Sequence, residues 1–292
     1  MKPNVPPSER PYKTVTAFEA ALTTRLKARV TSQRTYQDLR KELAFDRFLA
    51  RLMRVAPDSW LLKGGVALEY RLQQYARATT DIDISSKGTL DSISDALGAA
   101  ADVRMDDYFA VRIGESSRPV EEIATFRFAM DILYENGRMF EQIKIDVGLA
   151  DRWLGDPQEV TGPALLDFIG IDPVSVRAIP ITQHLAEKVH AYTKQYGARG
   201  STRVKDLVDM VLLVDAAPID GDAQAEILRK VFEARGTHPI PRELPPPPAG
   251  WRAPYARVAR GLRVPPTSEE AHAYVAERLL PSLLLTSQKA RS

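Results

Sequence analysis

The sequence contains no cysteine in its 292 residues. Disulfide bonds, thiolate metal sites and cysteine nucleophiles are therefore excluded. Apolar runs are short as well, since the one at residues 279–285 contains a proline and falls far below the roughly 20 residues that cross a bilayer. The proline-rich N-terminus lacks the apolar core of a secretory signal. These absences predict a cytoplasmic protein with no membrane partner.

The composition is that of a folded globular protein. Hydrophobic residues make up 44% of the chain and charged residues 27%, with a net charge of +2, values that are ordinary for soluble domains. The charge is unevenly spread, because residues 25–54 carry nine Lys and Arg against three acids. Such a segment forms either a solvated helix face or a surface that attracts phosphate groups, and composition by itself favours the first.

The first 175 residues mix two kinds of apolar pattern. Helical spacing of apolar residues predicts helices over residues 16–55 and 65–75, and a further helix is predicted over residues 89–101. Alternating or short apolar runs predict strands over residues 60–62, 80–85, 126–132 and 143–147. Asn136-Gly137 separates the last two strands and is a strong hairpin signal, so we expect these strands to be antiparallel neighbours.

Beyond residue 175 the pattern becomes helical. Helices are predicted over residues 182–195, 202–215, 221–234 and 267–285, the last beginning with a capping box at Thr267. Pro239 to Pro254 is rich in proline and predicts a rigid extended linker or crossover. We therefore expect an α+β protein with an N-terminal tail over 1–15, a mixed domain over 16–175 and a helical domain over 176–292.

Lys63-Gly64-Gly65 lies at a predicted junction of strand and helix. Glycines let backbone N–H groups approach a ligand closely, and a helix N-terminus favours an anion such as a triphosphate. A pair of glycines more often forms only a tight turn, so this signal is weak when taken by itself.

Asp81-Ile82-Asp83 places two carboxylates on one face of a predicted strand, because strand side chains alternate. Close like charges repel, and a divalent cation relieves the repulsion. Mg²⁺ accepts one or two carboxylates together with phosphate oxygens of a substrate. The alternative is an exposed strand edge with two solvated acids.

Asp146 lies on the polar face of the strand predicted over residues 143–147. If this strand pairs beside the one that carries Asp81 and Asp83, three carboxylates converge. Two-metal sites for phosphoryl transfer use such a group, with one ion activating the attacking hydroxyl and the other binding the triphosphate.

Four motifs between about residues 60 and 215 resemble, in order, those of the AbiEii/AbiGii toxin family of nucleotidyltransferases, which includes the MenT toxins. They are Gly64-Gly65-Val66-Ala67-Leu68 followed by Arg77, Thr79 or Thr80 and Asp81-Ile82-Asp83; Lys144-Ile145-Asp146-Val147; Gln183-His184-Leu185-Ala186-Glu187-Lys188-Val189-His190-Ala191; and Arg203-Val204-Lys205-Asp206-Leu207-Val208-Asp209. The resemblance implies a DNA-polymerase-β-like nucleotidyltransferase fold, a mixed sheet with flanking helices, followed by a helical domain that completes the cleft.

The resemblance also implies roles for these residues. Asp81, Asp83 and Asp146 would bind Mg²⁺, or Mn²⁺ in its place, and Asp146 is also a candidate general base. Lys63, Gly64 and Gly65 would hold phosphates. Lys188 would neutralise the triphosphate, while Arg203, Asp206 and Asp209 would fix the nucleotide and that lysine, with Asp209 the more essential of the two acids.

Each helical motif also has a plain structural interpretation. Lys188 would then be a surface lysine, and Arg203, Asp206 and Asp209 a surface salt-bridge ladder. His184 and His190 are six residues apart on a helix and do not face one ligand. We expect His190 to pack or to form a structural hydrogen bond. The order of the four motifs favours the functional interpretation for the other residues.

The family's activity, as implied by the resemblance, is transfer of an NMP from an NTP, often a pyrimidine nucleotide, to the 3′ acceptor end of tRNA. This blocks translation, and a cognate antitoxin accompanies such toxins of abortive-infection systems. The basic segment 25–54 suits RNA phosphates. Three alternatives stay open: a transferase that modifies proteins (AMPylation or UMPylation), a non-catalytic nucleotide-binding module, and a nuclease that uses the same three acids.

Overall fold

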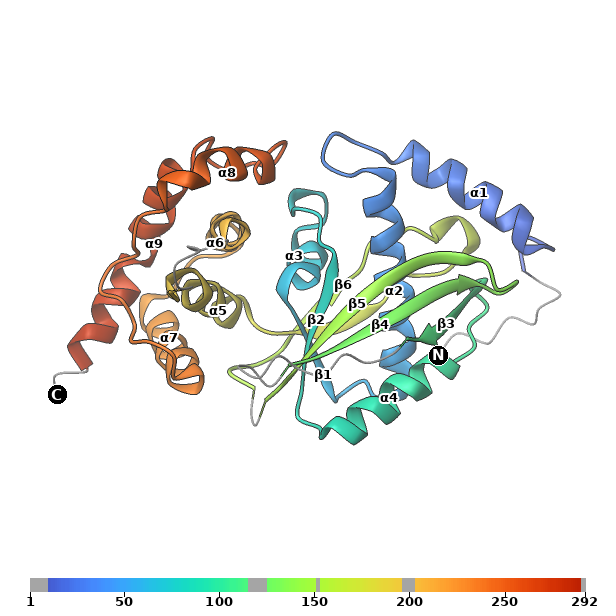
Figure 1. The fold of residues 1–292 in the computed structure, drawn as a ribbon, viewed down its shortest axis with the longest axis horizontal. Coiled ribbons are helices and arrows are strands. Elements are labelled where there is room, and N and C mark those ends of the chain that lie inside the picture. The colour runs from blue at the N-terminus through green and yellow to red at the C-terminus, as the bar shows by residue number, and fades with distance from the viewer. Residues whose placement is uncertain (1–9, 115–124, 151–152, 196–202, 290–292) are drawn as a thin grey trace. The chain divides into compact units, whose positions relative to one another are not determined.

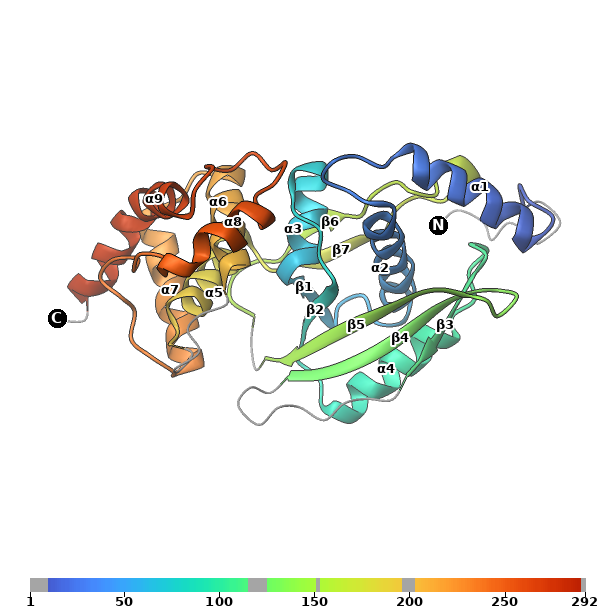
Figure 2. The ribbon, with the colours of Figure 1, turned by 45° about the horizontal axis from the view of Figure 1, so that its top comes forward.

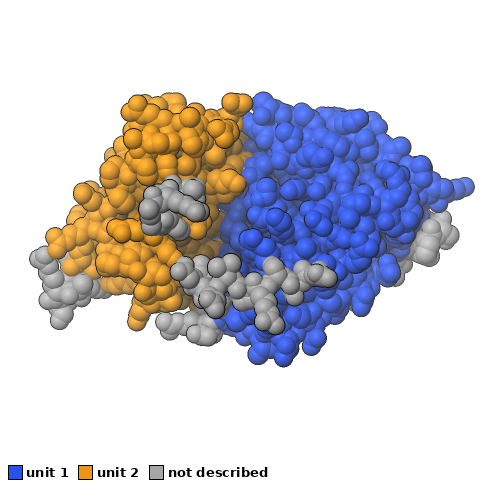
Figure 3. All heavy atoms as spheres, in the orientation of Figure 1, with its two compact units in different colours: residues 1–74, 78–152, 157–178 blue, residues 75–77, 153–156, 179–292 orange. Residues whose placement is uncertain are grey.

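The computed structural model describes residues 10–114, 125–150, 153–195 and 203–289. The chain forms two compact units (Figure 3). Unit 1 comprises residues 1–74, 78–152 and 157–178, and unit 2 comprises residues 75–77, 153–156 and 179–292. Among the helices that the structure describes, none combines the length and the apolar character that spanning a membrane requires.

Unit 1 contains a mixed sheet, which in the described part of the chain has seven strands in the order β3-β4-β5-β2-β1-β7-β6. The β2–β5 and β1–β7 pairs are parallel and the other pairs are antiparallel. The strands are β1 (Trp60–Lys63), β2 (Asp81–Ser86), β3 (Phe109–Ile113), β4 (Thr125–Tyr134), β5 (Met139–Leu149), β6 (Gln158–Thr161) and β7 (Ser175–Ala178). The predicted α+β class is confirmed, as are the predicted strands and the β4–β5 hairpin.

Four described α-helices accompany this sheet (Figures 1 and 2). They are α1 (Val15–Ala28), α2 (Tyr36–Val55), α3 (Gly64–Leu72) and α4 (Leu90–Asp102), with short 3₁₀ turns η2 (Gln73–Tyr75) and η3 (Asp167–Ile169). Threonine side chains cap the N-termini of α1, α2 and α4, and α2 has a full capping box between Thr35 and Asp38. Such caps satisfy backbone N–H groups that a helix leaves without partners.

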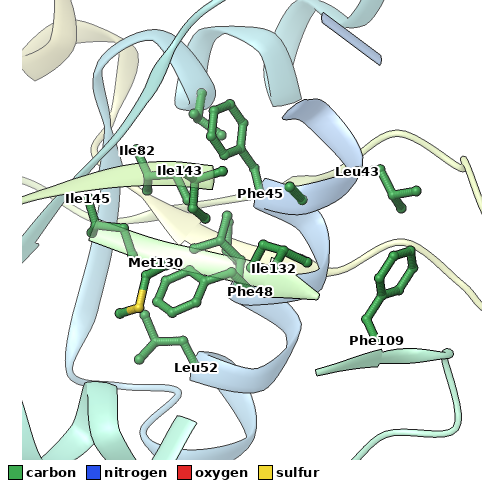
Figure 4. Packing of buried hydrophobic residues seen from close by; sticks show 14 of the residues in the cluster. Leu43, Phe45, Phe48, Leu52, Ile82, Phe109, Met130, Ile132, Ile143 and Ile145 are labelled. Atoms are coloured by element: carbon green, nitrogen blue, oxygen red, sulfur yellow. The ribbon is translucent and has the colours of Figure 1, made fainter. Parts of the chain in front are cut away.

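The core of unit 1 lies between α2 and one face of the sheet (Figure 4). Ile82, Ile143 and Ile145 are buried on that face, against Phe45 and Phe48 of α2. Full burial of each such side chain contributes about 1.5–3 kcal/mol. Because strand residues alternate, burial of these isoleucines turns the intervening polar residues of β2 and β5 to the opposite face.

The basic segment 25–54 is not a continuous charged surface. Arg34, Arg47 and Arg51 lie in the interior of unit 1, where acidic side chains neutralise them. Arg51 donates two hydrogen bonds of 2.8 Å to the buried carboxylate of Asp107. The prediction that this segment presents its charge to solvent or to RNA is therefore wrong for these three residues. Helix α2 is covered on most of its circumference, so its Arg47 and Arg51 serve as internal counterions.

Unit 2 is helical in the part that the structure describes. Its helices are α5 (Ile181–Thr193), α6 (Val204–Ala216), α7 (Gly221–Arg235), α8 (Arg252–Val258) and α9 (Ser268–Lys289), with a 3₁₀ turn η5 (Ala249–Trp251). The four predicted helices are confirmed, although residue 202, where the second was expected to begin, lies outside the described residues. The proline-rich stretch is not extended to its end, because the chain becomes helical at Ala249 and buries Trp251 against Tyr192.

Residues 10–14 contact the rest of unit 1, whereas residues 1–9 of the predicted tail lie outside the described residues. The Arg10 guanidinium lies 2.7 Å from carboxylate oxygens of both Asp106 and Glu135. The backbone N–H of Tyr12 donates to the Tyr108 hydroxyl at 2.9 Å. The end of the predicted tail is thus held by charge and by aromatic packing.

Candidate active site

Three carboxylates share the polar face of the sheet in unit 1. Asp81 and Asp83 lie on β2, and Asp146 lies on β5 directly opposite Asp83 in the parallel pair. The predicted pairing of the Asp146 strand with the strand of Asp81 and Asp83 is therefore confirmed. Because neighbouring strands are about 4.8 Å apart, this pairing brings the three carboxylates close together. We call Asp81, Asp83 and Asp146 the carboxylate face; all three are partly exposed.

Each of these carboxylates has a different neighbour. Asp81 accepts a hydrogen bond of 2.9 Å from the Thr80 hydroxyl. Asp83 lies against Gly64, where a Cβ atom would come within 2.0 Å of its Oδ2 atom. Asp146 accepts two hydrogen bonds of 2.6 Å from the guanidinium of Arg127 on β4. The three acids are therefore not equivalent.

The two glycines at the start of α3 are explained first by packing. Gly64 has a φ of +61°, which L side chains rarely adopt, and it makes room for Asp83. A Cβ at Gly65 would lie 2.3 Å from the Thr79 hydroxyl. Lys63, the N-cap residue, makes no side-chain capping hydrogen bond to the helix. Phosphate binding by this turn stays a prediction, and it is compatible with an N-terminus that its own side chain does not cap.

Sequence reasoning missed Gly148, two residues beyond Asp146 on the same side of β5. A Cβ at this position would lie 2.8 Å from the Nζ atom of Lys63. Because glycine has no side chain, the Lys63 ammonium fits beside β5 at Gly148. The sequence carried no signal for this, because the contact depends on the register of three strands.

Arg127 was also missed as a site residue. It lies on β4 directly opposite Asp146 in the antiparallel pair. Hydrogen bonding to Asp146 and the charge of Asp146 raise the pKa of Arg127 above its ordinary value, and the charges of Asp81 and Asp83 act in the same direction. The alternation of Phe126, Arg127 and Phe128 put this arginine on a polar face, but no sequence signal gave its partner.

The carboxylate face fits a divalent cation through two of its members. Among the residues that the structure describes, no set of three His, Asp or Glu side chains is arranged to hold a metal ion. Asp81 and Asp83 alone match the preference of Mg²⁺ for one or two carboxylates completed by phosphate oxygens and water. Both oxygens of Asp146 bind Arg127 in this conformation.

Unit 2 contains a separate group of charged side chains, which we call the ion cluster: Arg77, Lys188, Asp206 and Asp209. The Lys188 ammonium lies 2.8 Å from Asp206 and 2.7 Å from Asp209. Arg77 donates hydrogen bonds of 2.7 and 2.8 Å to the two oxygens of Asp209. Asp209 is completely buried. The expected contact between Lys188 and these two acids is confirmed.

Charge pairing keeps Lys188 and Asp209 ionised in spite of their burial. Burial opposes the charged form of Lys188, yet Asp209 and Asp206 raise its pKa above the ordinary value. Burial likewise opposes ionisation of Asp209, but Lys188 and Arg77 hold its pKa well below the usual range. Arg203, more exposed, lies 3.6 Å from Asp206. Lys188 is therefore not the solvated surface lysine of the structural interpretation.

His190 of α5 makes structural contacts within unit 2. His190 forms a hydrogen bond of 2.8 Å with the Thr237 hydroxyl and packs edge-on against Phe232. Burial, followed by the charge of nearby His238, lowers the pKa of His190 to about 4. The predicted structural role of His190 is confirmed.

The sequence matches a family model described as nucleotidyl transferase AbiEii toxin of type IV toxin–antitoxin systems, over residues 47–277. The chain belongs to the AbiEii family. The family resemblance stated from the four motifs is thereby confirmed. The chain is a nucleotidyltransferase toxin, so its class of reaction is NMP transfer from an NTP, and an antitoxin belongs to the system.

Comparison with solved structures gives the fold. The AbiEii-family chain is similar to MenT4, a nucleotidyltransferase toxin from Mycobacterium tuberculosis, with a TM-score of 0.61 and 18% identity over 93% of this chain and 91% of that chain. A second similar structure is JHP933 from Helicobacter pylori, with a TM-score of 0.47 and 11% identity over 86% of this chain and 95% of that chain. Among curated proteins, sequence comparison finds no match. The predicted nucleotidyltransferase fold is confirmed.

Proposed function

We propose that this toxin transfers an NMP, from a pyrimidine NTP, to the 3′ acceptor end of tRNA in a reaction that requires Mg²⁺ or Mn²⁺. The observation that carries the proposal is the carboxylate face, where Asp81 and Asp83 share one side of β2 and Asp146 lies opposite Asp83. Like charges so arranged favour a bound cation. Together with the family, this gives the acids a chemical purpose.

The residues of unit 1 divide the work of the transfer. Asp81 and Asp83 hold the cation, which when bound supplies charge neutralisation to the triphosphate. Lys63 and the backbone N–H groups of Gly64 and Gly65 bind phosphate oxygens at the start of α3. The acceptor hydroxyl oxygen forms the new bond to the α-phosphorus, the bond to the β,γ-pyrophosphate breaks, and pyrophosphate leaves.

Asp146 is the candidate base for the proton that the acceptor hydroxyl loses. General-base catalysis requires an oxygen within about 3 Å of the hydroxyl. The Asp146 carboxylate is partly exposed, so an acceptor hydroxyl can reach it. Both of its oxygens bind Arg127, and this ion pair has to open before Asp146 accepts the proton. Its role as a third metal ligand is the other form of the same proposal.

The residues of unit 2 contribute through charge. Lys188 neutralises the triphosphate and assists the departure of pyrophosphate, as the family resemblance implies. Asp206 and Asp209 keep Lys188 protonated, since they raise its pKa. Arg203 and these acids fix the nucleotide and the lysine. Asp209 has no exposed surface, so we assign it a positioning role that acts through Lys188 and Arg77.

The acceptor is the least constrained part of the proposal. A tRNA 3′ end is what the family resemblance implies, and blocked translation follows from its modification. The basic segment does not support RNA binding in the way the sequence suggested, because three of its arginines are internal. A protein hydroxyl would use the same nucleotide site, and it is the second candidate acceptor.

A labelling experiment tests the proposed reaction. Purified protein is incubated with total tRNA, Mg²⁺ and one labelled NTP at a time, beside Asp81→Asn and the matched control Asp95→Asn, which changes an exposed aspartate of α4. We expect label in tRNA from a pyrimidine NTP with wild type and the control, and none with Asp81→Asn.

The other outcomes separate the alternatives. Label in a protein band identifies a protein-modifying transferase, and tRNA shortened without NTP identifies a nuclease. Nucleotide binding without any transfer by the folded wild type contradicts the proposal and leaves a binding module.

A further inference from the structure

Arg127 and Asp146 form a two-pronged ion pair across the β4–β5 hairpin. The Arg127 Nε atom donates to Oδ1 and its Nη2 atom donates to Oδ2, each at 2.6 Å. The two residues are directly opposite in the strand register. Both oxygens of Asp146 therefore already have a cationic partner.

The pair is exposed enough to exchange partners. The Arg127 side chain is 55% exposed and that of Asp146 is 16% exposed. Exposed ion pairs contribute only about 0–1 kcal/mol to stability, because water competes for both partners. The guanidinium also lies in the electrostatic field of Asp81 and Asp83, which stabilise its charge. The guanidinium charge of Arg127 thus acts on all three members of the carboxylate face.

We propose that Arg127 is the resident counter-cation of the carboxylate face and competes with a divalent cation for Asp146. The proposal rests on the metal site proposed above. A carboxylate whose two oxygens bind a guanidinium has no oxygen positioned for an ion on the same side. A divalent cation and the guanidinium would also repel each other at contact distance. Binding of the cation by all three acids therefore requires that Arg127 leave Asp146.

This competition gives the site two states. With Arg127 on Asp146, a cation has only Asp81 and Asp83 as carboxylate ligands. With Arg127 displaced, Asp146 becomes available as a ligand or as a base. In the absence of nucleotide, the protein consequently binds a divalent cation more weakly than it would if all three carboxylates were available. Removal of the guanidinium shifts the equilibrium toward the second state.

The same sheet contains a matched pair for comparison. Arg112 on β3 is directly opposite Asp131 on β4, and its Nη2 atom lies 2.6 Å from Oδ2 of Asp131. Its side chain is 64% exposed and that of Asp131 is 12% exposed. Arg112→Gln removes the same charge from the same kind of cross-strand pair without touching the carboxylate face.

Binding of Mn²⁺ alone, followed by the electron paramagnetic resonance signal of the free ion, tests the proposal without any turnover. Wild type, Arg127→Gln, Arg127→Lys, Arg112→Gln and Asp81→Asn are titrated, each with circular dichroism to show that it is folded. We expect Arg127→Gln to bind Mn²⁺ about tenfold more tightly than wild type, from the loss of a competing charge. Arg127→Lys should lie between them, since lysine makes no two-pronged contact, and Arg112→Gln should equal wild type.

The outcomes distinguish this proposal from the metal assignment. Equal Mn²⁺ affinity in wild type and Arg127→Gln, with binding lost in Asp81→Asn, overturns the competition and leaves the metal site standing. Equal strengthening by Arg127→Gln and Arg112→Gln also overturns it, because net charge would then be the cause. Mn²⁺ binding that Asp81→Asn leaves unchanged, or no binding to wild type and Arg127→Gln, overturns the metal site and the competition together.

Discussion

The carboxylate face of unit 1 and the ion cluster of unit 2 use the same kinds of side chain under opposite conditions. Asp146 pairs with an arginine that is 55% exposed. Asp209 is completely buried between Arg77 and Lys188, which hold its pKa far below the usual range. Exposed ion pairs like the first contribute little to stability, so an exchange of partners is expected to cost little. Removing one partner of the second leaves a charge in the interior.

The contrast suggests different requirements for a site that binds ligands and for a cluster that stabilises the fold. A site that binds cations and substrates needs charges that water and ligands reach, and it tolerates weak pairing. A cluster that fixes a lysine needs charges that stay paired. Substitutions on the carboxylate face should therefore change activity with little effect on stability, whereas substitutions in the ion cluster should change stability first.

The largest expected loss of stability is that of Asp209→Ala. Arg77 and Lys188 would lose their shared buried partner, and breaking such a pair costs about 3–5 kcal/mol in the free energy of unfolding. Urea unfolding followed by circular dichroism measures the loss, with Asp95→Ala as the exposed control. A loss below about 1 kcal/mol would show that the ion cluster does not stabilise unit 2.

Arg51→Met tests whether the loss of stability depends on the burial of the ion pair or on the unit that contains it. Arg51 is fully buried in unit 1 and binds Asp107 through two hydrogen bonds. Asp107 keeps a second cation, because Arg47 lies 3.7 Å away. We expect a loss of about 3 kcal/mol in unfolding free energy, at the lower end for a broken buried pair. An effect as small as that of an exposed arginine would break the comparison.

The lowered pKa of His190 in unit 2 predicts a dependence of stability on pH. The folded pKa of His190 is about 4, below the value of about 6.5 in an unfolded chain. As pH falls from about 6.5 to 4, the unfolded state binds a proton that the folded state does not, so stability falls. One such proton gives a slope of at most about 1.4 kcal/mol per pH unit. Urea unfolding of His190→Gln between pH 7 and 4.5 should show a smaller slope than wild type, and an equal slope would refute this assignment.

The smallest expected effect on stability is that of the exposed cross-strand pairs. Arg112→Gln and Arg127→Gln should each lower the free energy of unfolding by about 0–1 kcal/mol. Thermal unfolding of the two variants beside wild type measures this. A loss of about 3 kcal/mol for Arg127→Gln would mean that its pair with Asp146 is structural, contrary to the exchange proposed for it.

Local sequence patterns predicted most of the helices and the longer strands. Asn136-Gly137 and the alternation on both sides of it predicted the β4–β5 hairpin, which the structure confirms with a positive φ at Gly137. The short strands β3, β6 and β7 were not predicted, whereas the equally short β1 was predicted from its continuous apolar run Trp60-Leu61-Leu62. The sequence also did not determine the strand register, so the pairing of Arg127 with Asp146 could not be predicted. Burial of Arg47 and Arg51 depends on what packs around α2, which a charge count does not reveal.

Transfer of label from an NTP by Asp83→Asn, measured together with its free energy of unfolding, tests the central claim most directly. Asparagine has nearly the same shape beside Gly64 but lacks the charge that binds a cation. The account predicts a loss of transfer on the order of a thousandfold and an unfolding free energy within about 1 kcal/mol of wild type. Transfer near the wild-type rate by this folded variant would contradict the assignment of the carboxylate face as the active site.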